Sequence, residues 1–294
     1  MKDEARRISK EKTATRLAYD FVPQVHPVLH IDGLELTKQA AAESVDVLIA
    51  DWMYMPYEGS AQAALPPVEI PSDPKQHLVE CIIEARRVLA QRGAMFLFVD
   101  HRSDPSESIL RALKDNGLRR MDQYIFQKMS AVFSQRDGQA FANSHDIVDV
   151  YRRSDVSYFP RMLQYERSVS PKWHCRSHRT SAEPAVHPFE KPVELMKVLI
   201  SAITVNGLVL DPFAGSGSAG VAAVQLDCSY RGAELVEEYV QIANRRISLA
   251  ADREAETVEA INAALTGADR EQHAAIVLHL ERAGIKLEAK EAIQ

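Results

Sequence analysis

A glycine-rich loop between an apolar strand and an apolar helix constrains the fold of this chain more than any other feature. The loop, Asp-Pro-Phe-Ala-Gly-Ser-Gly at 211–217, follows the strand pattern LVL and precedes a helix pattern rich in alanine and valine. Gly215 and Gly217 allow positive φ angles and a close approach of the backbone to a ligand. The N–H groups at the start of the helix favour a carboxylate or a phosphate. The pattern predicts an α/β protein with a cofactor-binding loop.

An acidic residue ends the next predicted strand, YRGAEL at 230–235. Glu234 follows Gly215 by about 20 residues, a position from which a carboxylate accepts hydrogen bonds from the ribose hydroxyls of a nucleoside cofactor. The run GSGSAG also fits a dinucleotide fingerprint, so a nicotinamide-dependent oxidoreductase is one alternative. Asp211 argues against it, because a carboxylate there would repel a pyrophosphate but hold the ammonium of a methionine moiety. S-adenosylmethionine is therefore the favoured cofactor.

Strands and helices alternate before the loop, which indicates a parallel sheet. Buried strands are expected at VDVLIA (45–50) and AMFLFVD (94–100), with a helix between them that starts at Ser72-Asp73-Pro74 and ends at Gly93. The other expected elements are a helix over 104–116, strands over 124–129 and 147–152, a helix over 193–203, and a helix after the strand at 230–235.

Charge and cysteine content exclude several classes of protein. With 35 Lys+Arg against 41 Asp+Glu, the net charge of −6 excludes a protein that coats nucleic acid by overall positive charge. The three cysteines form no CxxC pair, which argues against a disulfide scaffold and suits a reducing cytoplasm. His174, Cys175 and His178 are three metal ligands without a fourth, so no metal is expected. We also expect no secretory signal and no membrane-spanning helix.

Three segments closely resemble the amino-methyltransferases of DNA, which methylate adenine N6 or cytosine N4: HPFEKPVELMKVLI (187–200), VLDPFAGSGSAG (209–220) and YRGAELVEEYVQIANRRI (230–247). The similarity is to the permuted subgroup, in which the catalytic segment precedes the cofactor loop. It implies the Rossmann-like fold of S-adenosylmethionine-dependent methyltransferases, with a mixed seven-stranded sheet and helices on both faces. The expected organisation is a polar arm (1–27), a catalytic domain (28–250) and a helical C-terminal extension (251–294).

The resemblance also implies roles for matched residues. The glycine loop would cradle the methionine part of the cofactor, Glu234 would hold its ribose, and Asp32 in HIDGLEL (30–36) would lie near its adenine. Lys191 and Pro192 would belong to the segment that flanks the cofactor carboxylate. The expected cofactor-binding residues are Asp32, Lys191, Asp211, Phe213, Gly215, Gly217 and Glu234.

The segment SVDVLIADWMY (44–54) aligns with the family segment that ends in Asp-Pro-Pro-Tyr. Methylation of an exocyclic amine needs hydrogen-bond acceptors that localise the nitrogen lone pair, and an aromatic ring that stacks on the flipped base. Asp51 and Tyr54 are the expected catalytic residues. An aspartate at the first position favours adenine over cytosine as the target base.

Trp52 and Met53 depart from the family pattern, because they replace the two prolines that aim the backbone carbonyl acceptor. An acceptor misplaced by about 1 Å lowers the rate by on the order of 100-fold. The alternative hypothesis is therefore a catalytically impaired homologue that binds cofactor and DNA as a regulatory or structural subunit. Methylation of cytosine N4 is a further alternative.

The DNA contacts are expected in a basic insert over 152–186. Residues 151–180 hold 7 Lys+Arg against 2 Asp+Glu, interleaved with aromatic residues, which suits phosphate contact and base stacking, although a solvated basic loop would look the same. Just before it, Asn143, His145 and Asp146 either line the base pocket or cap a strand. A homodimer and a partner subunit for target recognition are further expectations. The expected DNA-binding residues are Arg152, Arg153, Arg161, Lys172, Arg176 and Arg179.

Overall fold

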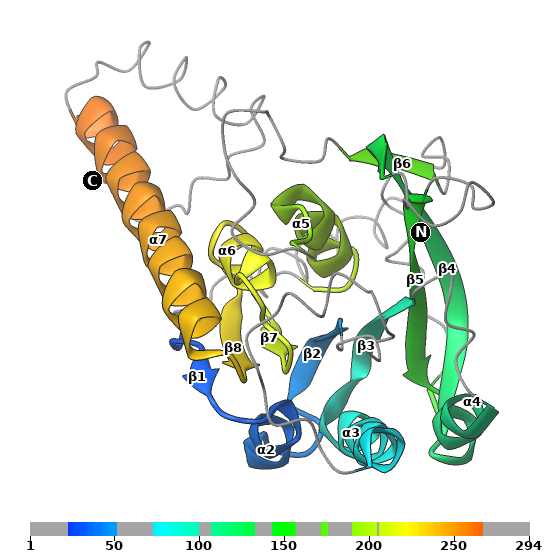
Figure 1. Cartoon of the computed structure of the whole chain (residues 1–294). Coiled ribbons are helices and arrows are strands. Elements are labelled where there is room, and N and C mark those ends of the chain that lie inside the picture. The colour runs from blue at the N-terminus through cyan, green and yellow to red at the C-terminus, as the bar shows by residue number, and fades with distance from the viewer. Residues whose placement is uncertain are drawn as a thin grey trace, which may run out of the picture. The chain divides into compact units, whose positions relative to one another are not determined.

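A mixed β-sheet with helices on both faces forms the centre of the computed structural model (Figure 1). The structure describes residues 23–51, 73–99, 107–132, 143–156, 172–175, 190–204 and 206–266. Its strands are β1 (Leu29–His30), β2 (Val45–Ala50), β3 (Leu89–Val99), β4 (Leu118–Val132), β5 (Asn143–Arg153), β6 (Lys172–Cys175), β7 (Leu208–Asp211) and β8 (Ser229–Glu234). Among these residues the order is β1-β8-β7-β2-β3-β5-β4-β6. Seven strands make the expected mixed sheet, and the two-residue β1 pairs with β8 at its edge.

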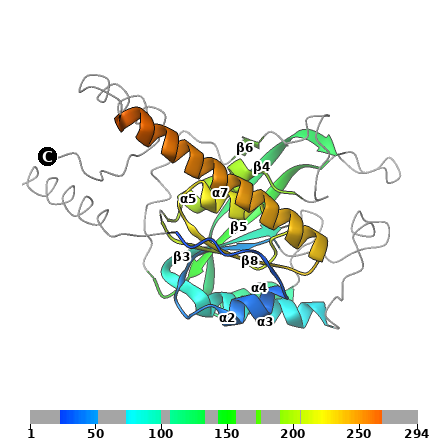
Figure 2. The same cartoon turned by 90° about the vertical axis from the view of Figure 1, so that its left-hand side faces the viewer.

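The helices divide between the two faces of the sheet (Figure 2). On one face lie α2 (Gly33–Gln39), α3 (Pro74–Val88) and α4 (Glu107–Asp115). On the other lie α5 (Val193–Ser201) and α6 (Ser218–Val224), and α7 (Glu237–Thr266) begins after β8. The α/β fold expected from the alternation of strands and helices is confirmed.

The chain divides into two compact units, Met1–Ile247 and Ser248–Gln294. The organisation into an arm, a catalytic domain and a C-terminal extension stays a prediction. The first unit contains the whole sheet and the start of α7. The second unit contains the rest of α7 as far as Thr266. Nowhere in the described residues is there a helix with the length and apolar character needed to cross a membrane.

The central strands are buried on both sides, which explains their continuous apolar sequences. Strand β2 pairs in parallel with β3 and with β7, and every residue of VDVLIA except Asp46 is almost fully buried. The exception, Asp46, accepts a hydrogen bond from the Leu208 N–H at 2.9 Å and so ties the start of β7 to β2. The strand predicted at 45–50 is confirmed at both ends.

The boundary between α3 and β3 differs from the prediction for a physical reason. The helix α3 starts where expected, with the Asp73 carboxylate accepting from the Gln76 N–H at 3.0 Å, but it ends at Val88 rather than at Gly93. Strand β3 begins at once, and its register on β2 shifts between Val45 and Val47. A Cβ on Gly93 would lie 2.6 Å from the Val45 carbonyl oxygen. This glycine therefore permits close strand contact and does not end the helix.

Candidate active site

Three acidic residues from distant parts of the sequence meet at one edge of the sheet. Asp51 directly follows β2, Asp211 ends β7, and Glu234 ends β8. These three strands are parallel neighbours, with Leu48 opposite Leu210 and Asp211 opposite Gly232. The carboxyl ends of parallel strands are where open α/β sheets bind ligands. The sheet topology therefore gathers the predicted catalytic carboxylate with two predicted cofactor ligands.

The glycine loop lies directly above this edge, between β7 and α6. Gly215 and Gly217 have φ angles of 51° and 79°, and Gly217 is the N-cap of α6. A Cβ on Gly217 would lie 2.9 Å from the Cβ of Ala243 in α7. Both the backbone conformation and the packing against α7 therefore require glycine at this position.

The carboxylate of Glu234, at the end of β8, holds the glycine loop by hydrogen bonds. It accepts hydrogen bonds from the N–H groups of Gly215 and Val236, each at 2.9 Å. Burial raises the pKa of Glu234, while these backbone N–H groups lower it. A carboxylate oxygen accepts more than one hydrogen bond, so these contacts are compatible with binding a ribose.

Asp211 is the most buried acid of the site, with 2% of the residue exposed. Its carboxylate accepts hydrogen bonds from the Tyr230 hydroxyl at 3.2 Å and from the Phe213 N–H at 3.4 Å. Burial, with smaller contributions from the nearby charges of Asp51 and Glu234, raises the pKa of Asp211 to about 7. Near neutral pH, a cation beside this carboxylate would favour its ionised form.

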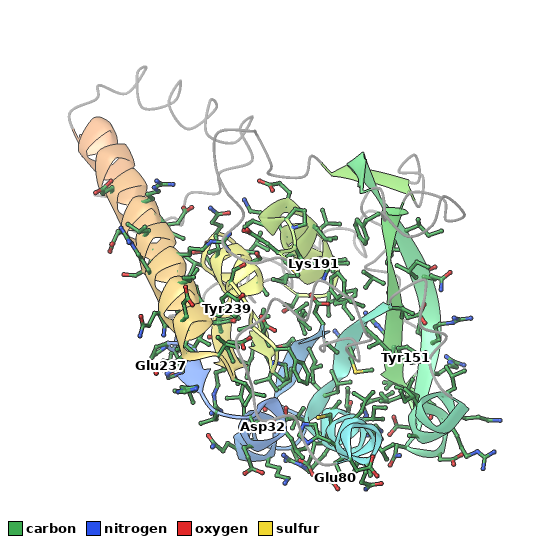
Figure 3. All side chains as sticks on the ribbon, viewed as in Figure 1. Asp32, Glu80, Tyr151, Lys191, Glu237 and Tyr239 are labelled. Carbon is green, nitrogen blue, oxygen red and sulfur yellow. The ribbon has the colours of Figure 1, made fainter. Side chains whose placement is uncertain are left out.

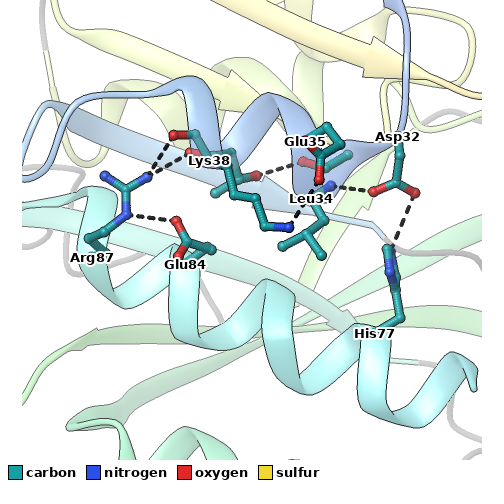
Figure 4. Close-up of polar contacts among 9 residues, drawn as sticks. Asp32, Leu34, Glu35, Lys38, His77, Glu84 and Arg87 are labelled. Atoms are coloured by element: carbon teal, nitrogen blue, oxygen red, sulfur yellow. Dashed lines mark hydrogen bonds and ion pairs between the residues drawn. The ribbon is translucent and has the colours of Figure 1, made fainter.

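Asp32 lies beside the start of the loop. It is the N-cap of α2, where one oxygen accepts from the Leu34 N–H at 2.8 Å and the other lies 3.4 Å from Nε2 of His77 (Figure 4). A Cβ on Gly33 would collide with the Pro212 carbonyl, so the start of α2 packs directly on the loop. This placement is compatible with the predicted position of Asp32 near the cofactor.

Lys191 lies closer to Asp51 than the sequence suggests. Its Nζ is 2.6 Å from Oδ2 of Asp51 and 4.9 Å from the centroid of the Phe98 ring. Its side chain is 8% exposed, and it lies between α5 and the sheet (Figure 3). The prediction put Lys191 in the segment that flanks the cofactor carboxylate, whereas its observed ionic partner is the predicted catalytic carboxylate.

Sequence reasoning missed three residues that hold this site together: His77, Tyr230 and Arg246. Arg246 in α7 donates to the Ser216 carbonyl at 2.7 Å and forms an ion pair with Glu190 at 2.6 Å. Tyr230 and Arg246 both lie in the segment 230–247 that carries the resemblance, which was the available signal. Nothing in the sequence pattern marks His77.

Several predicted residues lie outside the described part of the chain: Trp52, Met53, Tyr54, Arg161, Arg176, His178 and Arg179. Residues 143–146 begin β5 at the edge where β3 ends, since Ile147 pairs with Val99. Lys172 begins β6, which pairs with β4 from Ile125 to Lys128, toward the same edge. These backbone positions keep both segments on the side of the sheet that carries Asp51.

Arg152 and Arg153, two of the predicted DNA-binding residues, lie away from the edge of the sheet that carries Asp51. They pair with Arg119 and Leu118, at the opposite end of the sheet from Ile147. The Arg153 residue is 7% exposed, and its guanidinium forms ion pairs with Asp155 and Glu43. Because two carboxylates already engage this buried guanidinium, we expect Arg153 to stabilise the fold rather than to bind DNA.

Comparison with known proteins agrees with this geometry. The family model N6_N4_Mtase, described as DNA methylase, matches residues 72–245, which is more than half of the chain. This chain belongs to the N6/N4 DNA methylase family. The resemblance to the amino-methyltransferases of DNA is therefore confirmed, whereas the permuted subgroup stays a prediction. The glycine loop, Glu234 and Lys191 all lie within the matched range.

Named relatives support the same conclusion. The DNA adenine methyltransferase YhdJ of Escherichia coli (strain K12) is 25% identical over 272 residues, which cover 84% of this chain and 91% of that protein. The type II methyltransferase M2.LlaDCHI of Lactococcus lactis subsp. cremoris is 25% identical over 241 residues, covering 75% of this chain and 88% of that protein.

Solved structures support the fold. The M1.HpyAVI–SAM complex has a TM-score of 0.54 at 22% identity, over 75% of this chain and 98% of that one. A putative DNA modification methylase of Thermus thermophilus, TTHA0409, has a TM-score of 0.56 at 20% identity, over 77% of this chain and 95% of that one.

Proposed function

We propose that this protein transfers a methyl group from S-adenosylmethionine to the exocyclic N6 amine of adenine in DNA. The observation that carries the proposal is the carboxylate of Asp51, which lies at the carboxyl edge of the sheet beside the acids of a glycine-loop cofactor site. Asp51 begins the segment in which the family carries its catalytic tetrapeptide. The choice of adenine rests on the aspartate at that position and on the name of the relative YhdJ.

The residues of the site fit S-adenosylmethionine. Asp211 is a buried carboxylate whose pKa, about 7, leaves it ready to ionise beside an ammonium group. Glu234, which ends β8 and bonds the loop, would accept from the ribose, and Asp32 would lie near the adenine. The glycine loop supplies backbone N–H groups and the space that a side chain would fill. When bound, the cofactor supplies an electrophilic methyl group on its sulfonium.

Asp51 would act on the target amine. Its carboxylate accepts a hydrogen bond from an amine N–H, which weakens the delocalisation of the nitrogen lone pair into the ring. On taking up the methyl group that the cofactor supplies, the amine would lose one proton, which an acceptor at this edge of the sheet would receive. Tyr54 would stack on the base flipped from the duplex. The DNA would lie along β6 and the basic residues Arg161, Arg176 and Arg179.

Transfer of labelled methyl to unmethylated bacterial DNA, followed by nucleoside analysis, tests the proposal. We expect labelled N6-methyladenine from the wild type and none from Asp51→Ala, with cofactor binding intact by calorimetry in both. Asp115→Asn, an exposed position on α4, is the matched control and should leave transfer unchanged. N4-methylcytosine as the product would contradict the choice of base.

The same experiment separates the enzyme from an impaired homologue. Trp52 and Met53 replace the prolines that the family carries. Cofactor binding without transfer in the wild type, together with transfer by the double variant Trp52→Pro/Met53→Pro, would favour the regulatory or structural subunit.

We further propose a homodimer or a partner subunit for target recognition, and the cytoplasm as the compartment. Light scattering of the purified chain, with and without DNA, tests the oligomeric state.

A further inference from the structure

The ion pair between Lys191 and Asp51 joins the segment before α5 to the end of β2. The two residues are 140 positions apart in sequence, and their charged atoms are 2.6 Å apart. Both side chains are largely buried, with exposures of 8% for Lys191 and 18% for Asp51. A buried ammonium needs a partner, and here the partners are one carboxylate and the face of Phe98.

The surroundings of Asp51 would otherwise disfavour its ionised form. Asp211, at the end of the neighbouring strand, is a second and deeply buried carboxyl, and Asp51 is close enough to raise its pKa. Behind Asp211 lie Tyr230, which donates to it, and the further acid Glu234. The Lys191 ammonium forms an ion pair with Asp51. The neighbouring Asp211 carboxyl and burial thus favour protonation of Asp51, and the Lys191 ammonium opposes it.

The protonation state of Asp51 decides its chemistry. An ionised carboxylate only accepts hydrogen bonds, whereas a protonated carboxyl also presents an O–H donor. The target amine offers N–H donors, so it needs an acceptor. In a protonated Asp51, the oxygen that carries the proton would be a donor and would no longer serve as an acceptor for the target amine.

The position of Lys191 is itself fixed by its neighbour in sequence. Glu190 forms an ion pair with Arg246, and the same guanidinium donates to the Ser216 carbonyl of the glycine loop. The segment that carries Lys191 is therefore anchored to the cofactor loop. This anchor holds the ammonium at Asp51 rather than in solvent.

We propose that Lys191 is a positioning residue for methyl transfer, which keeps the Asp51 carboxylate ionised and oriented toward the target amine. That this helps methyl transfer rests on the proposed function. That Lys191 keeps Asp51 ionised rests on the ion pair alone. The proposal gives Lys191 a role at the reacting amine in place of the expected role at the cofactor carboxylate.

The test that does not depend on activity is an NMR titration of ¹³C-carboxyl-labelled aspartate, with the Asp51 signal assigned from its loss in Asp51→Asn. In Lys191→Met, which keeps length and removes charge, the titration midpoint of Asp51 should rise by about one pH unit or more. Lys191→Arg should retain most of the wild-type midpoint. Lys197→Met, in α5, is the matched control and should leave it unchanged. An unchanged midpoint in folded Lys191→Met would overturn the proposal.

Kinetics supply the second measurement. In Lys191→Met the acid limb of the pH profile of kcat should move upward with the Asp51 midpoint, while the Kd for S-adenosylmethionine changes little. A large rise in that Kd with an unmoved midpoint would return Lys191 to the cofactor carboxylate and overturn the proposal. If the Asp51 midpoint rises in Lys191→Met but the wild type transfers no methyl group to any DNA, the electrostatic role of the ion pair is supported and the proposed function is contradicted.

Discussion

The hydroxyl of Tyr230 donates a hydrogen bond to the buried carboxylate of Asp211, with 3.2 Å between the two oxygens. Both residues are buried, and they come from the adjacent parallel strands β8 and β7. Burial and the neighbouring Asp211 raise the pKa of Tyr230 well above its ordinary value, so the tyrosine remains a donor. The contact stabilises the ionised form of Asp211 against its burial.

Replacement of Tyr230 by phenylalanine therefore raises the pKa of Asp211 above its present value of about 7. Near neutral pH less of the carboxylate is ionised, and S-adenosylmethionine binds more weakly. The loss in affinity should shrink as pH rises, because alkali ionises Asp211 in the variant as well. Calorimetric titrations of the wild type and the variant from about pH 6.5 to about pH 8.5 measure this. An equal loss at every pH would contradict the mechanism.

The stability of the free protein should depend on the same carboxyl group. The folded pKa of Asp211 is raised from 3.8 to about 7, so between these values the folded state holds a proton that the unfolded state has lost. Stability from this group is complete below the unfolded pKa and falls as pH rises toward 7, with a slope of up to about 1 kcal/mol per pH unit. Asp211→Asn should remove that slope, whereas Asp115→Asn should keep it. Urea unfolding at several pH values between about 4 and about 8 provides the measurement.

Arg153 should contribute to folding and not to DNA affinity. Its guanidinium is buried and bridges Asp155 and Glu43 at the end of the sheet opposite Asp51. Arg153→Met removes the buried cation from both carboxylates, of which Asp155 keeps its ion pair with Arg86, and should lower the melting temperature. The affinity for DNA and its dependence on salt should remain those of the wild type, because no phosphate contact is lost. A decreased salt slope in fluorescence anisotropy would show that Arg153 contacts DNA after all.

Gly217→Ala separates two reasons for a glycine in the loop. The φ of 79° is strained for alanine, and the new Cβ would lie 2.9 Å from that of Ala243. We expect a loss of about 1–3 kcal/mol in the free energy of unfolding and a weaker affinity for cofactor. Ala243→Gly in the same chain removes the Cβ contact, but the contact with the Ala243 Cα at 3.0 Å, the strained φ and the cost of a glycine inside α7 remain, so it should restore only part of the stability. Complete restoration would mean that packing alone requires the glycine.

The sequence predicted the site residues that end strands, but not the contacts between residues that are distant in sequence. Asp51, Asp211 and Glu234 each follow or end an apolar run, and parallel pairing brings such positions together. The contact of Lys191 with Asp51 depends on how the segment before α5 folds over the sheet, which no local pattern encodes. The strand β6 was missed because its four residues show no clear alternation of apolar and polar side chains. Gly93 was misread because a glycine after a helix pattern is also typical of a helix end.

The bridge through Arg246 yields a prediction about coupling. Its guanidinium joins the Ser216 carbonyl of the cofactor loop to Glu190, the residue before Lys191. Arg246→Met should therefore weaken cofactor binding through the loop and lower kcat through Lys191. Glu190→Gln keeps the loop contact and should lower kcat with less effect on the Kd for S-adenosylmethionine.

A double-mutant cycle tests whether Arg246 and Glu190 act on kcat through the same interaction. If the bridge acts as a unit, the effect on kcat of the two changes together should be clearly smaller than the sum of their separate effects, expressed as free energies. Arg245→Met, the neighbouring arginine on α7, is the matched control and should show additive behaviour with Glu190→Gln. Additive effects for Arg246 and Glu190 would mean that the cofactor loop and the Lys191 segment are held independently, although one guanidinium contacts both.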